Sequence, residues 1–341
     1  MTFINITSSK NIRKQHPKGT KPSLKSATKA KPKYKKLTSI ETLARQIEKS
    51  GSFLKRVLRA GERLTVGNQN AARLRALLGV EGVTPLPLLS DVSLRIQAAN
   101  ILFDTTKRLL RTVAPKGTPM FHITFVDDIG LMSDRKPILK LAALKRKVDK
   151  AIRSLGLSGV VMVEVQALTN YPAKGEGRTL MVNAHGLCWG TVSRRKFRAA
   201  KQKLNGSRSW KNQFGAQPIF SRRLEGGRPD ALRIISYLAK MPHDGKYRVP
   251  IAKDKFRFHP TLKGYPDSLA LRIAEGLSHY SIYDAVFAVG DGKGIRKAWK
   301  SEVEAWHRDR LKDADQVHTF DVSAFWTELR SASIYRPYEL E

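Results

Sequence analysis

The sequence is poor in the residues that mark several common protein classes. Cys188 is its single cysteine, which excludes an internal disulfide and any zinc module built on several cysteines. No apolar run approaches the roughly 18 to 20 residues that a membrane-spanning helix needs, and the N-terminal region lacks the apolar stretch of a signal peptide. We therefore expect a protein of a reducing compartment, the cytoplasm, without a membrane partner.

Acidic residues are scarce as well. The 341 residues include 63 Lys and Arg against 29 Asp and Glu, which gives a net charge of +34. Self-repulsion of this size does not favour folding, whereas a polyanion neutralises it, and nucleic acid releases counterions when it does so. Hydrophobic residues make up 41% of the chain, which is enough for a substantial core. We expect a folded protein whose partner is nucleic acid.

Composition and periodicity divide the chain into four parts. Residues 1–38 hold 11 Lys and Arg and no acidic residue, which predicts a disordered arm that binds phosphate without reading sequence. Helical spacing with arginine on the polar faces predicts a helical DNA-binding module over residues 39–115. Residues 116–250 alternate between strand and helix patterns, and we expect a helical region and a tail over residues 251–341.

The third part carries the fold prediction. Apolar and polar residues alternate, as they do in strands, in FHITFV (121–126), VVMVEVQAL (160–168) and TLMVNAHGLCW (179–189). Helical spacing that stops at Gly156 separates the first strand from the second. The order strand, helix, strand, strand predicts an α+β fold: a ferredoxin-like (split βαβ) antiparallel sheet core with helices on one face, flanked by helical segments.

Polar residues interrupt two of these strands. Side chains alternate along a strand, so Asn183 and His185 share one face, as do Glu164 and Gln166. If the two strands pair as a hairpin, a carboxylate, an imidazole and an amide oxygen can converge, which suits Mg²⁺ or Mn²⁺. The competing interpretation is structural: Glu164 pairs with one of the many arginines, and Asn183 and His185 bond to each other.

A tyrosine on a later helix is the candidate nucleophile. In DALRIISYLAK (230–240), Arg233, Tyr237 and Lys240 form one helical stripe, opposite a stripe of apolar residues. Cations one turn to either side favour the phenolate and can hold a phosphate group. The alternative is that Tyr237 only borders the core.

In this order, the strand FHITFV, the acidic strand VEVQ, the strand ending in HGLCWG and the Tyr-x-x-Lys helix resemble the HUH endonucleases. That superfamily includes rolling-circle replication initiators, relaxases and related transposases. The resemblance implies a nuclease that nicks single-stranded DNA through a 5′-phosphotyrosine, with a divalent metal at the scissile phosphate. It implies that Tyr237 is the nucleophile and that Lys240 positions phosphate or metal. The metal ligands that it implies are His185, Asn183 and Glu164.

The sequence departs from the superfamily at Asn183, where the histidine–hydrophobic–histidine strand has its first histidine. An amide oxygen can ligate a hard cation, but it binds more weakly and carries no charge. Either Asn183 acts as a substitute ligand, or this chain is a degenerate or distant member with impaired cleavage. Tyr237 has no second tyrosine one turn away on its helix, so the resemblance implies a single nucleophile.

Basic segments beside these strands are the expected DNA contacts. Residues 193–206 predict a strongly basic helix, and the loop that follows is rich in arginine, glycine and aromatic residues. Trp210, Phe214 and Phe220 either stack on unpaired bases or anchor this loop to the core. The predicted nucleic-acid contacts are Arg194, Arg195, Lys196, Arg198, Trp210, Arg222, Arg223 and Arg233.

Three functions remain open from the sequence. The first is initiation of rolling-circle replication of a plasmid or phage-like element, on single-stranded or hairpin DNA and with host replication proteins as partners. The second is a non-catalytic, basic nucleic-acid-binding protein on the same scaffold, in which Asn183 marks a lost metal site. The third is an RNA-associated protein in which Tyr237 is structural. Asp127 and Asp128 are expected in a solvated turn or a helix cap.

Overall fold

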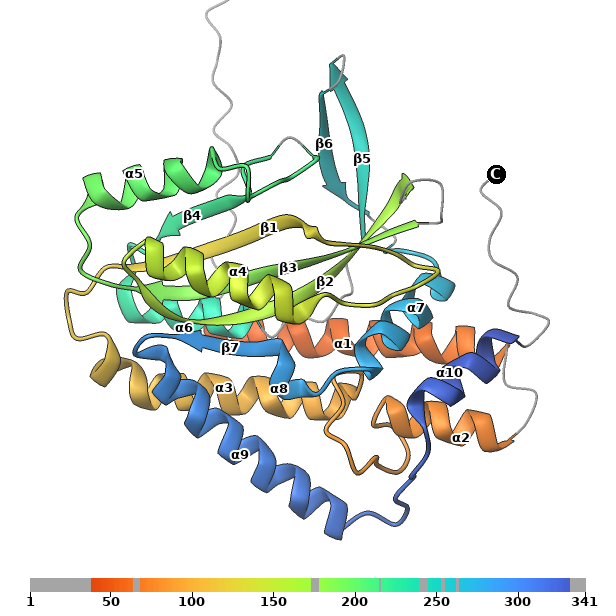
Figure 1. Ribbon diagram of the computed structural model, residues 1–341. Coiled ribbons are helices and arrows are strands. Elements are labelled where there is room, and N and C mark those ends of the chain that lie inside the picture. Colours follow the sequence, from red (N-terminus) through yellow and green to blue (C-terminus); the bar gives the residue numbers. More distant parts are fainter. Residues whose placement is uncertain are drawn as a thin grey trace, which may run out of the picture. The chain divides into compact units, whose positions relative to one another are not determined.

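The computed structural model describes residues 38–63, 68–172, 178–214, 216–238, 245–252, 255–261 and 264–331 (Figure 1). The predicted basic arm, apart from Thr38, lies outside these residues. The described part of the chain is a mixed α+β structure with ten helices and seven strands. None of its helices combines the length and the apolar character needed to cross a membrane.

The helices are α1 (Ser39–Glu62), α2 (Asn68–Leu77), α3 (Val92–Val113), α4 (Leu141–Ser154), α5 (Arg194–Asn205), α6 (Gly227–Leu238), α7 (Asp267–Ser278), α8 (Ile282–Ala285), α9 (Gly292–Lys312) and α10 (Val322–Ser331). The strands are β1 (Met120–Ser133), β2 (Ser158–Pro172), β3 (Arg178–Trp189), β4 (Ile219–Arg223), β5 (Gly245–Ala252), β6 (Lys255–Pro260) and β7 (Val286–Val289).

Side-chain caps mark several of the helix starts. Thr38 and Glu41 form a reciprocal capping box at the first turn of α1, and Ser193 accepts a hydrogen bond from the Lys196 amide at the start of α5. After the C-terminal end of α4, Gly156 has a φ of +71°, the left-handed conformation that ends many helices. This confirms the stop predicted there.

The strands form one mixed sheet in the order β4-β1-β3-β2-β5-β6, and β7 also pairs with β2. The pairs β4–β1, β1–β3 and β3–β2 are all antiparallel, whereas β2 and β5 run parallel. The register places His185 opposite Thr124 on one side and Met162 on the other, and it places Asn183 opposite Glu164. Residues paired in this way project from the same face of the sheet.

One face of the sheet is apolar and lies under α4 and α5 (Figure 1). Phe121 of β1 stacks on Phe197 of α5, with 4.7 Å between the ring centroids. Phe125, which is fully buried, packs against Trp210, and the Lys147 ammonium of α4 lies 4.8 Å from the centre of that indole. These contacts hold α4 and α5, the helices that connect the strands, on one face of the sheet.

The opposite face is covered by α6, which contacts β1, β2 and β3 and in turn packs on α1 and α3. The sheet is therefore covered on both faces, not on one as predicted. The reason lies in β3, where every residue from Thr179 to Trp189 is buried. A strand without a solvated side needs helices on each face of its sheet.

The first strand is longer than the sequence pattern predicted. It continues past Val126 to Ser133 through an irregularity in its pairing with β3. Asp127 lies in this irregular stretch, buried, and not in a solvated turn. Its carboxylate forms an ion pair with Lys147 and accepts hydrogen bonds from the backbone amides of Ile129 and Lys211. This carboxylate ties the loop after α5 to the sheet.

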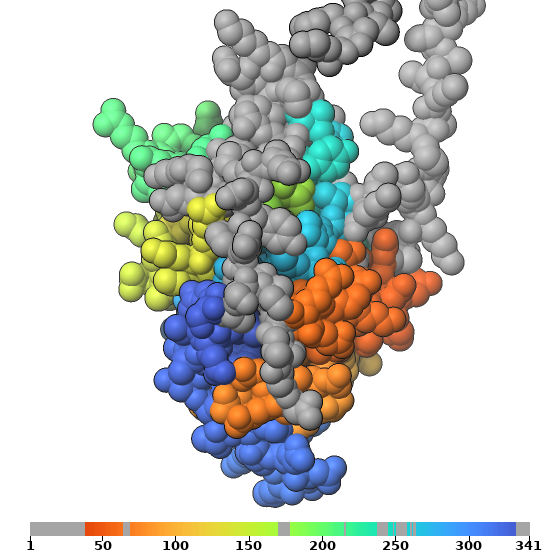
Figure 2. Space-filling view, turned by 90° about the vertical axis from the view of Figure 1, so that its right-hand side faces the viewer, coloured from red at the N-terminus to blue at the C-terminus, as the bar shows by residue number. Residues whose placement is uncertain are grey.

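One hydrophobic core joins segments far apart in the sequence. It includes Phe53 of α1, Leu102 of α3, Phe125 of β1, Trp299 of α9 and Trp326 of α10. Helices α2 and α10 lie side by side in both views, and Asn70 donates a hydrogen bond to Glu328 between them (Figure 2). The helices on either side of the sheet region thus share its core, and the predicted boundaries at residues 115 and 250 remain predictions.

Candidate functional site

The predicted metal ligands lie together on the face of the sheet that α6 covers. Glu164 and Gln166 come from β2, Asn183 and His185 from β3, and Thr124 from β1. We call these five residues the polar cluster. All but Thr124 are buried: Asn183 is 2% exposed and His185 is 8% exposed. Alternation along the strands and the hairpin pairing of β2 with β3 bring them together, as the sequence predicted.

Both nitrogens of the His185 ring have an oxygen nearby. Nε2 lies 2.9 Å from Glu164 Oε2, and Nδ1 lies 3.1 Å from the Thr124 hydroxyl oxygen. The other oxygen of Glu164 accepts a hydrogen bond of 3.2 Å from the Gln166 amide. If His185 carries its proton on Nδ1, it donates to Thr124 and presents an Nε2 lone pair, which is the arrangement of a histidine that binds metal.

Two amide oxygens of the polar cluster have no hydrogen-bond partner within the described residues. They are Asn183 Oδ1 and Gln166 Oε1, and both are buried. The bond between Asn183 and His185 that the structural interpretation expected is therefore not made through this oxygen. A buried acceptor without a partner costs about 1–3 kcal/mol, so a native fold rarely keeps two of them side by side without a reason.

The donor set fits a hard divalent cation. In an octahedral site with ligand distances of about 2.1 Å, neighbouring ligands are about 3.0 Å apart. The 2.9 Å between Glu164 Oε2 and His185 Nε2 is close to that value. The described residues do not bring three His, Cys, Asp or Glu side chains together as ligands, so a cation here would take its third protein ligand from an amide. Asn183 Oδ1 is the natural candidate.

A buried arginine adds positive charge next to the polar cluster. Burial lowers the pKa of Arg95, on α3, to about 10, and the attraction of Glu164 opposes that shift. Arg95 is therefore still charged at neutral pH and offers Glu164 a cation that is already part of the fold. This arginine is the kind of partner that the structural interpretation expected for Glu164. Arg95 is not among the predicted site residues, although an arginine directly after Leu94 in an apolar helical stretch is a sequence signal for a buried cation.

A second histidine stands beside the polar cluster. The His122 ring on β1 lies 5.8 Å from the His185 ring. Burial lowers the pKa of His122 to about 3, and electrostatic interactions with His185, Arg222 and Arg233 act in the same direction. His122 is therefore neutral at physiological pH.

Helix α6 brings the predicted nucleophile segment to this face. The helix starts at Gly227, and the Asp230 carboxylate accepts a hydrogen bond from the Gly226 amide at its N-terminus. Arg233 is close enough to His122 to lower its pKa, so its stretch of α6 faces the sheet near the polar cluster. Tyr237 lies one turn further along the backbone of α6; its side chain and all of Lys240 lie outside the described residues.

Most of the predicted nucleic-acid contacts are exposed. The exposed basic side chains of α5 and β4 are Arg194, Arg195, Lys196, Arg198, Arg222 and Arg223. Arg233 of α6 is half-buried. Trp210 is the exception, because its ring is 6% exposed and packs between Phe125 and Lys147. The expectation that Trp210 stacks on bases is corrected: it anchors its loop to the core. Phe214 is buried as well.

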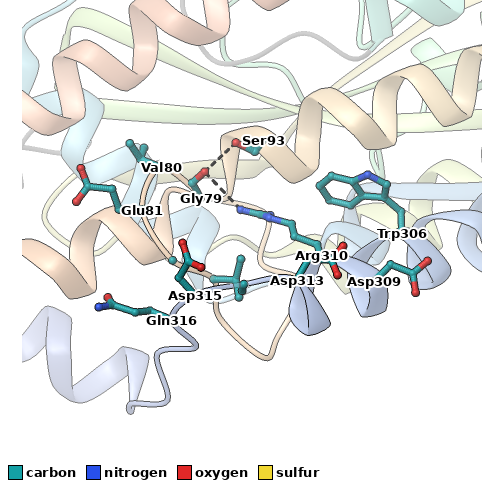
Figure 3. Close-up of a pocket in the computed structure, with 13 residues that line it drawn as sticks. Gly79, Val80, Glu81, Ser93, Trp306, Asp309, Arg310, Asp313, Asp315 and Gln316 are labelled. Atoms are coloured by element: carbon teal, nitrogen blue, oxygen red, sulfur yellow. Dashed lines mark hydrogen bonds between the residues drawn. The ribbon is translucent and has the colours of Figure 1, made fainter.

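A separate pocket, of about 990 Å³, has a different character (Figure 3). It lies between the end of α2, the start of α3 and the end of α9. Arg310 inside it is engaged, because it donates to Asp91 at 2.6 Å and to the Gly79 carbonyl. None of the sequence-predicted site residues lines this pocket. Its acidic lining residues, Glu81, Asp309, Asp313 and Asp315, would repel a nucleic-acid phosphate.

Comparisons with known proteins give no independent guide to this site. No protein-family model, no curated protein and no solved structure matches the chain. What the site does has to be argued from the geometry of the polar cluster, its charges and the helix against it.

Proposed function

We propose that this protein is a metal-dependent enzyme that nicks and rejoins single-stranded DNA through a 5′-phosphotyrosine. Its biological role would be to initiate rolling-circle replication of a plasmid or phage-like element in the cytoplasm, with host replication proteins as partners. The observation that carries the proposal is the contact between His185 and Glu164 on the face that the helix of Tyr237 covers. Asn183, on the same face, has an oxygen without a hydrogen-bond partner among the described residues.

The topology of the sheet supports a ferredoxin-like core. The chain runs β1-α4-β2-β3-α5-β4, and the spatial order of its strands is β4-β1-β3-β2 with every neighbour antiparallel. This is the arrangement of two interleaved split βαβ units. Helices α4 and α5 lie on one face, as such a core requires. The other face, which such a core leaves open, is the one with the polar cluster and α6.

The residues of the polar cluster have distinct roles in this proposal. Glu164, His185 and Asn183 would hold Mg²⁺ or Mn²⁺, and Thr124 would fix the orientation of the His185 ring. A bound divalent cation would withdraw charge from the scissile phosphate. Arg95 limits the negative charge that Glu164 contributes, which suits a site that must also accept a phosphate.

The covalent step is a phosphodiester exchange. The phenolic oxygen of Tyr237 forms a bond to phosphorus, the bond from phosphorus to the 3′ oxygen breaks, and that oxygen leaves with a proton as a 3′-hydroxyl. Lys240 and Arg233 would stabilise the charge on the phosphoryl oxygens. The phosphotyrosine keeps the energy of the broken bond, so the reverse reaction rejoins the strand without ATP.

A second candidate is a non-catalytic nucleic-acid-binding protein on the same scaffold. Arg95 favours it, because a buried guanidinium can balance Glu164 without any metal. Asn183 favours it too, since an amide oxygen, a weaker metal ligand than an imidazole, takes the place where the HUH endonucleases have a histidine. In this case the basic surface of α5 and β4 would bind nucleic acid with no covalent step.

The test is adduct formation with labelled single-stranded oligonucleotides in the presence of Mn²⁺. We expect a covalent protein–DNA species that survives denaturation, is lost in EDTA, and is abolished by Tyr237→Phe. The matched control is Tyr247→Phe, which removes the hydroxyl of an exposed tyrosine on β5 and should leave the adduct unchanged. Glu164→Gln, which keeps the side-chain volume, should reduce both the yield of the adduct and the increase in that yield when Mn²⁺ is added.

Two results would count against the proposal. An adduct that persists in the Tyr237→Phe variant would place the nucleophile elsewhere. If the unaltered chain binds DNA tightly but forms no adduct with Mn²⁺ or Mg²⁺ on any oligonucleotide of a randomised pool, the non-catalytic function is the correct one.

A further inference from the structure

The outer strand β4 presents an aromatic side chain to solvent. It is the terminal strand of the sheet on the side of β1. Phe220, the second residue of β4, is 59% exposed, whereas its neighbour Ile219 is fully buried. An exposed phenylalanine forfeits the roughly 1.5–3 kcal/mol that burial of such a side chain contributes.

The register places Phe220 on the same face as the polar cluster. It pairs with Thr124, and Arg222 pairs with His122. Thr124 in turn contacts His185, so the order across the face is Phe220, Thr124, His185. Neighbouring strands lie about 4.8 Å apart, which puts the Phe220 backbone roughly 10 Å from that of His185.

Exposure increases along this face toward β4. The residues of the polar cluster on β2 and β3 are buried, whereas Thr124 and His122 on β1 are half-buried. Phe220 and Arg222 on β4 are exposed. Helix α6 packs on β1, β2 and β3 and covers β4 less closely. A ligand that reaches the polar cluster across the sheet would therefore cross β4 first.

The charge around Phe220 indicates what kind of ligand that is. Arg222 is exposed on the same face, Arg223 is exposed on the opposite one, and Lys201 of α5 donates a hydrogen bond to Ser221 between them. An apolar protein partner would gain nothing from cations on both faces of the strand. An aromatic ring beside arginine is the combination that binds unpaired nucleic acid, since the ring stacks on a base and the guanidinium contacts a phosphate.

We infer that β4 is the entry contact for single-stranded DNA, with Phe220 stacked on an unpaired base and Arg222 on a backbone phosphate. This inference rests on the proposed function, because it supplies the substrate to the polar cluster. It adds a selection of unpaired over duplex DNA, which the cleavage chemistry alone does not provide. A base held in a duplex hides its face in the stack, so Phe220 selects unpaired DNA before any cleavage takes place.

The experiment measures binding and stacking apart from cleavage. Full-length protein is titrated, in EDTA, with oligothymidylate that carries one 2-aminopurine, a base whose fluorescence is quenched by stacking. Phe220→Ala is expected to weaken binding by about fivefold or more and to abolish the quench, because one stacked base contributes roughly 1–3 kcal/mol. Phe220→Trp should retain both. The control is Ile138→Ala, which removes another exposed apolar side chain and should change neither.

Two arginines give the matched test of the phosphate contact. Arg222→Gln should weaken binding and lower the salt dependence by about one ion. The control is Arg308→Gln, which removes an exposed arginine of α9 and should change neither the affinity nor the quench. The inference is overturned if Phe220→Ala binds within about twofold of the unaltered chain. It is also overturned if a duplex gives the same quench as the single strand.

These readouts separate the entry contact from the proposed chemistry. If stacking depends on Phe220 but no adduct ever forms with Mn²⁺, the entry contact stands and the enzymatic function fails. If adduct formation requires Tyr237 while Phe220→Ala changes neither affinity nor quench, the enzymatic function stands and the entry contact fails.

Discussion

The two faces of one sheet differ in what they bury. Under α4 and α5, Phe121, Ile123 and Phe125 meet apolar residues of β2 and β3. Under α6, the same three strands bury a carboxylate, two amides and an imidazole. Backbone pairing and twist are shared by both faces, so only the side chains distinguish them.

This difference shows where stability has been given up. Buried polar groups cost free energy unless they are fully hydrogen-bonded, and Asn183 and Gln166 each keep an oxygen without a partner among the described residues. Apolar residues at these positions would make a more stable protein. Proteins keep such features mainly at functional sites, which is why we assign function to the α6 face and structure to the α4 face.

The largest effect is expected from breaking the apolar face. Phe125→Ala should lower the free energy of unfolding by about 3–5 kcal/mol, because the ring is fully buried against Trp210 and its loss leaves a cavity. Urea unfolding measures this change. The same substitution at Phe220 should change the stability by no more than about 0.5 kcal/mol, since that ring is exposed. Equal losses at the two positions would contradict the assignment of the faces.

An intermediate effect is expected from pH on the polar face. The pKa of His122 is about 3 in the folded protein, against an ordinary value of 6.5. Between these values the unfolded chain binds a proton that the folded chain does not, so stability falls as the pH is lowered through this window. Through His122, the free energy of unfolding changes by up to about 1.4 kcal/mol per pH unit in this window.

His122→Gln should remove this part of the pH dependence. Urea unfolding in EDTA at pH 7, 6 and 5 compares the two slopes, and carboxylates elsewhere contribute equally to both proteins. A slope that is the same with and without His122 would mean that the ring is protonated in the folded state.

The smallest effect is a gain in stability. The Asn183 oxygen has no partner in the described part of the chain, and Asn183→Leu replaces this amide by an apolar side chain of similar size. The substitution should raise the free energy of unfolding by about 1 kcal/mol without metal. Any stabilisation by Mn²⁺ should be lost at the same time. Gln166→Leu is the contrast, because it also removes a hydrogen bond to Glu164 and should destabilise the protein. A loss of stability in both variants would show that Asn183 is satisfied in solution.

The sequence predicted the part of the fold that depends on regular alternation. The strands β1, β2 and β3 and the helix between the first two follow from period-two and helical spacing, and the meeting of Glu164 with His185 follows from the hairpin. The short strand β4 lies where the sequence predicts a loop, because five residues rich in arginine carry no strand pattern. The strand β7 lies where the sequence predicts a helical region, because VFAV continues an apolar run whose period cannot be resolved over four residues.

The sequence could not predict which side chains from distant segments complete the site. Arg95 lies far from Glu164 along the chain, and only the packing of α3 behind α6 brings its charge to the sheet. The burial of Trp210 also depends on tertiary contacts, namely the hydrogen bond that Asp127 accepts from the Lys211 amide in the same loop. Local periodicity carries no information about either contact.

The position of Asn183 has an evolutionary consequence. It lies in the middle of β3, where pairing with β1 and β2 holds the backbone from both sides. Codons for asparagine and histidine differ in their first base alone. A point mutation can therefore exchange the amide for an imidazole without disturbing the strand. If the proposed function holds, a single mutational step separates a cleaving protein from one that only binds.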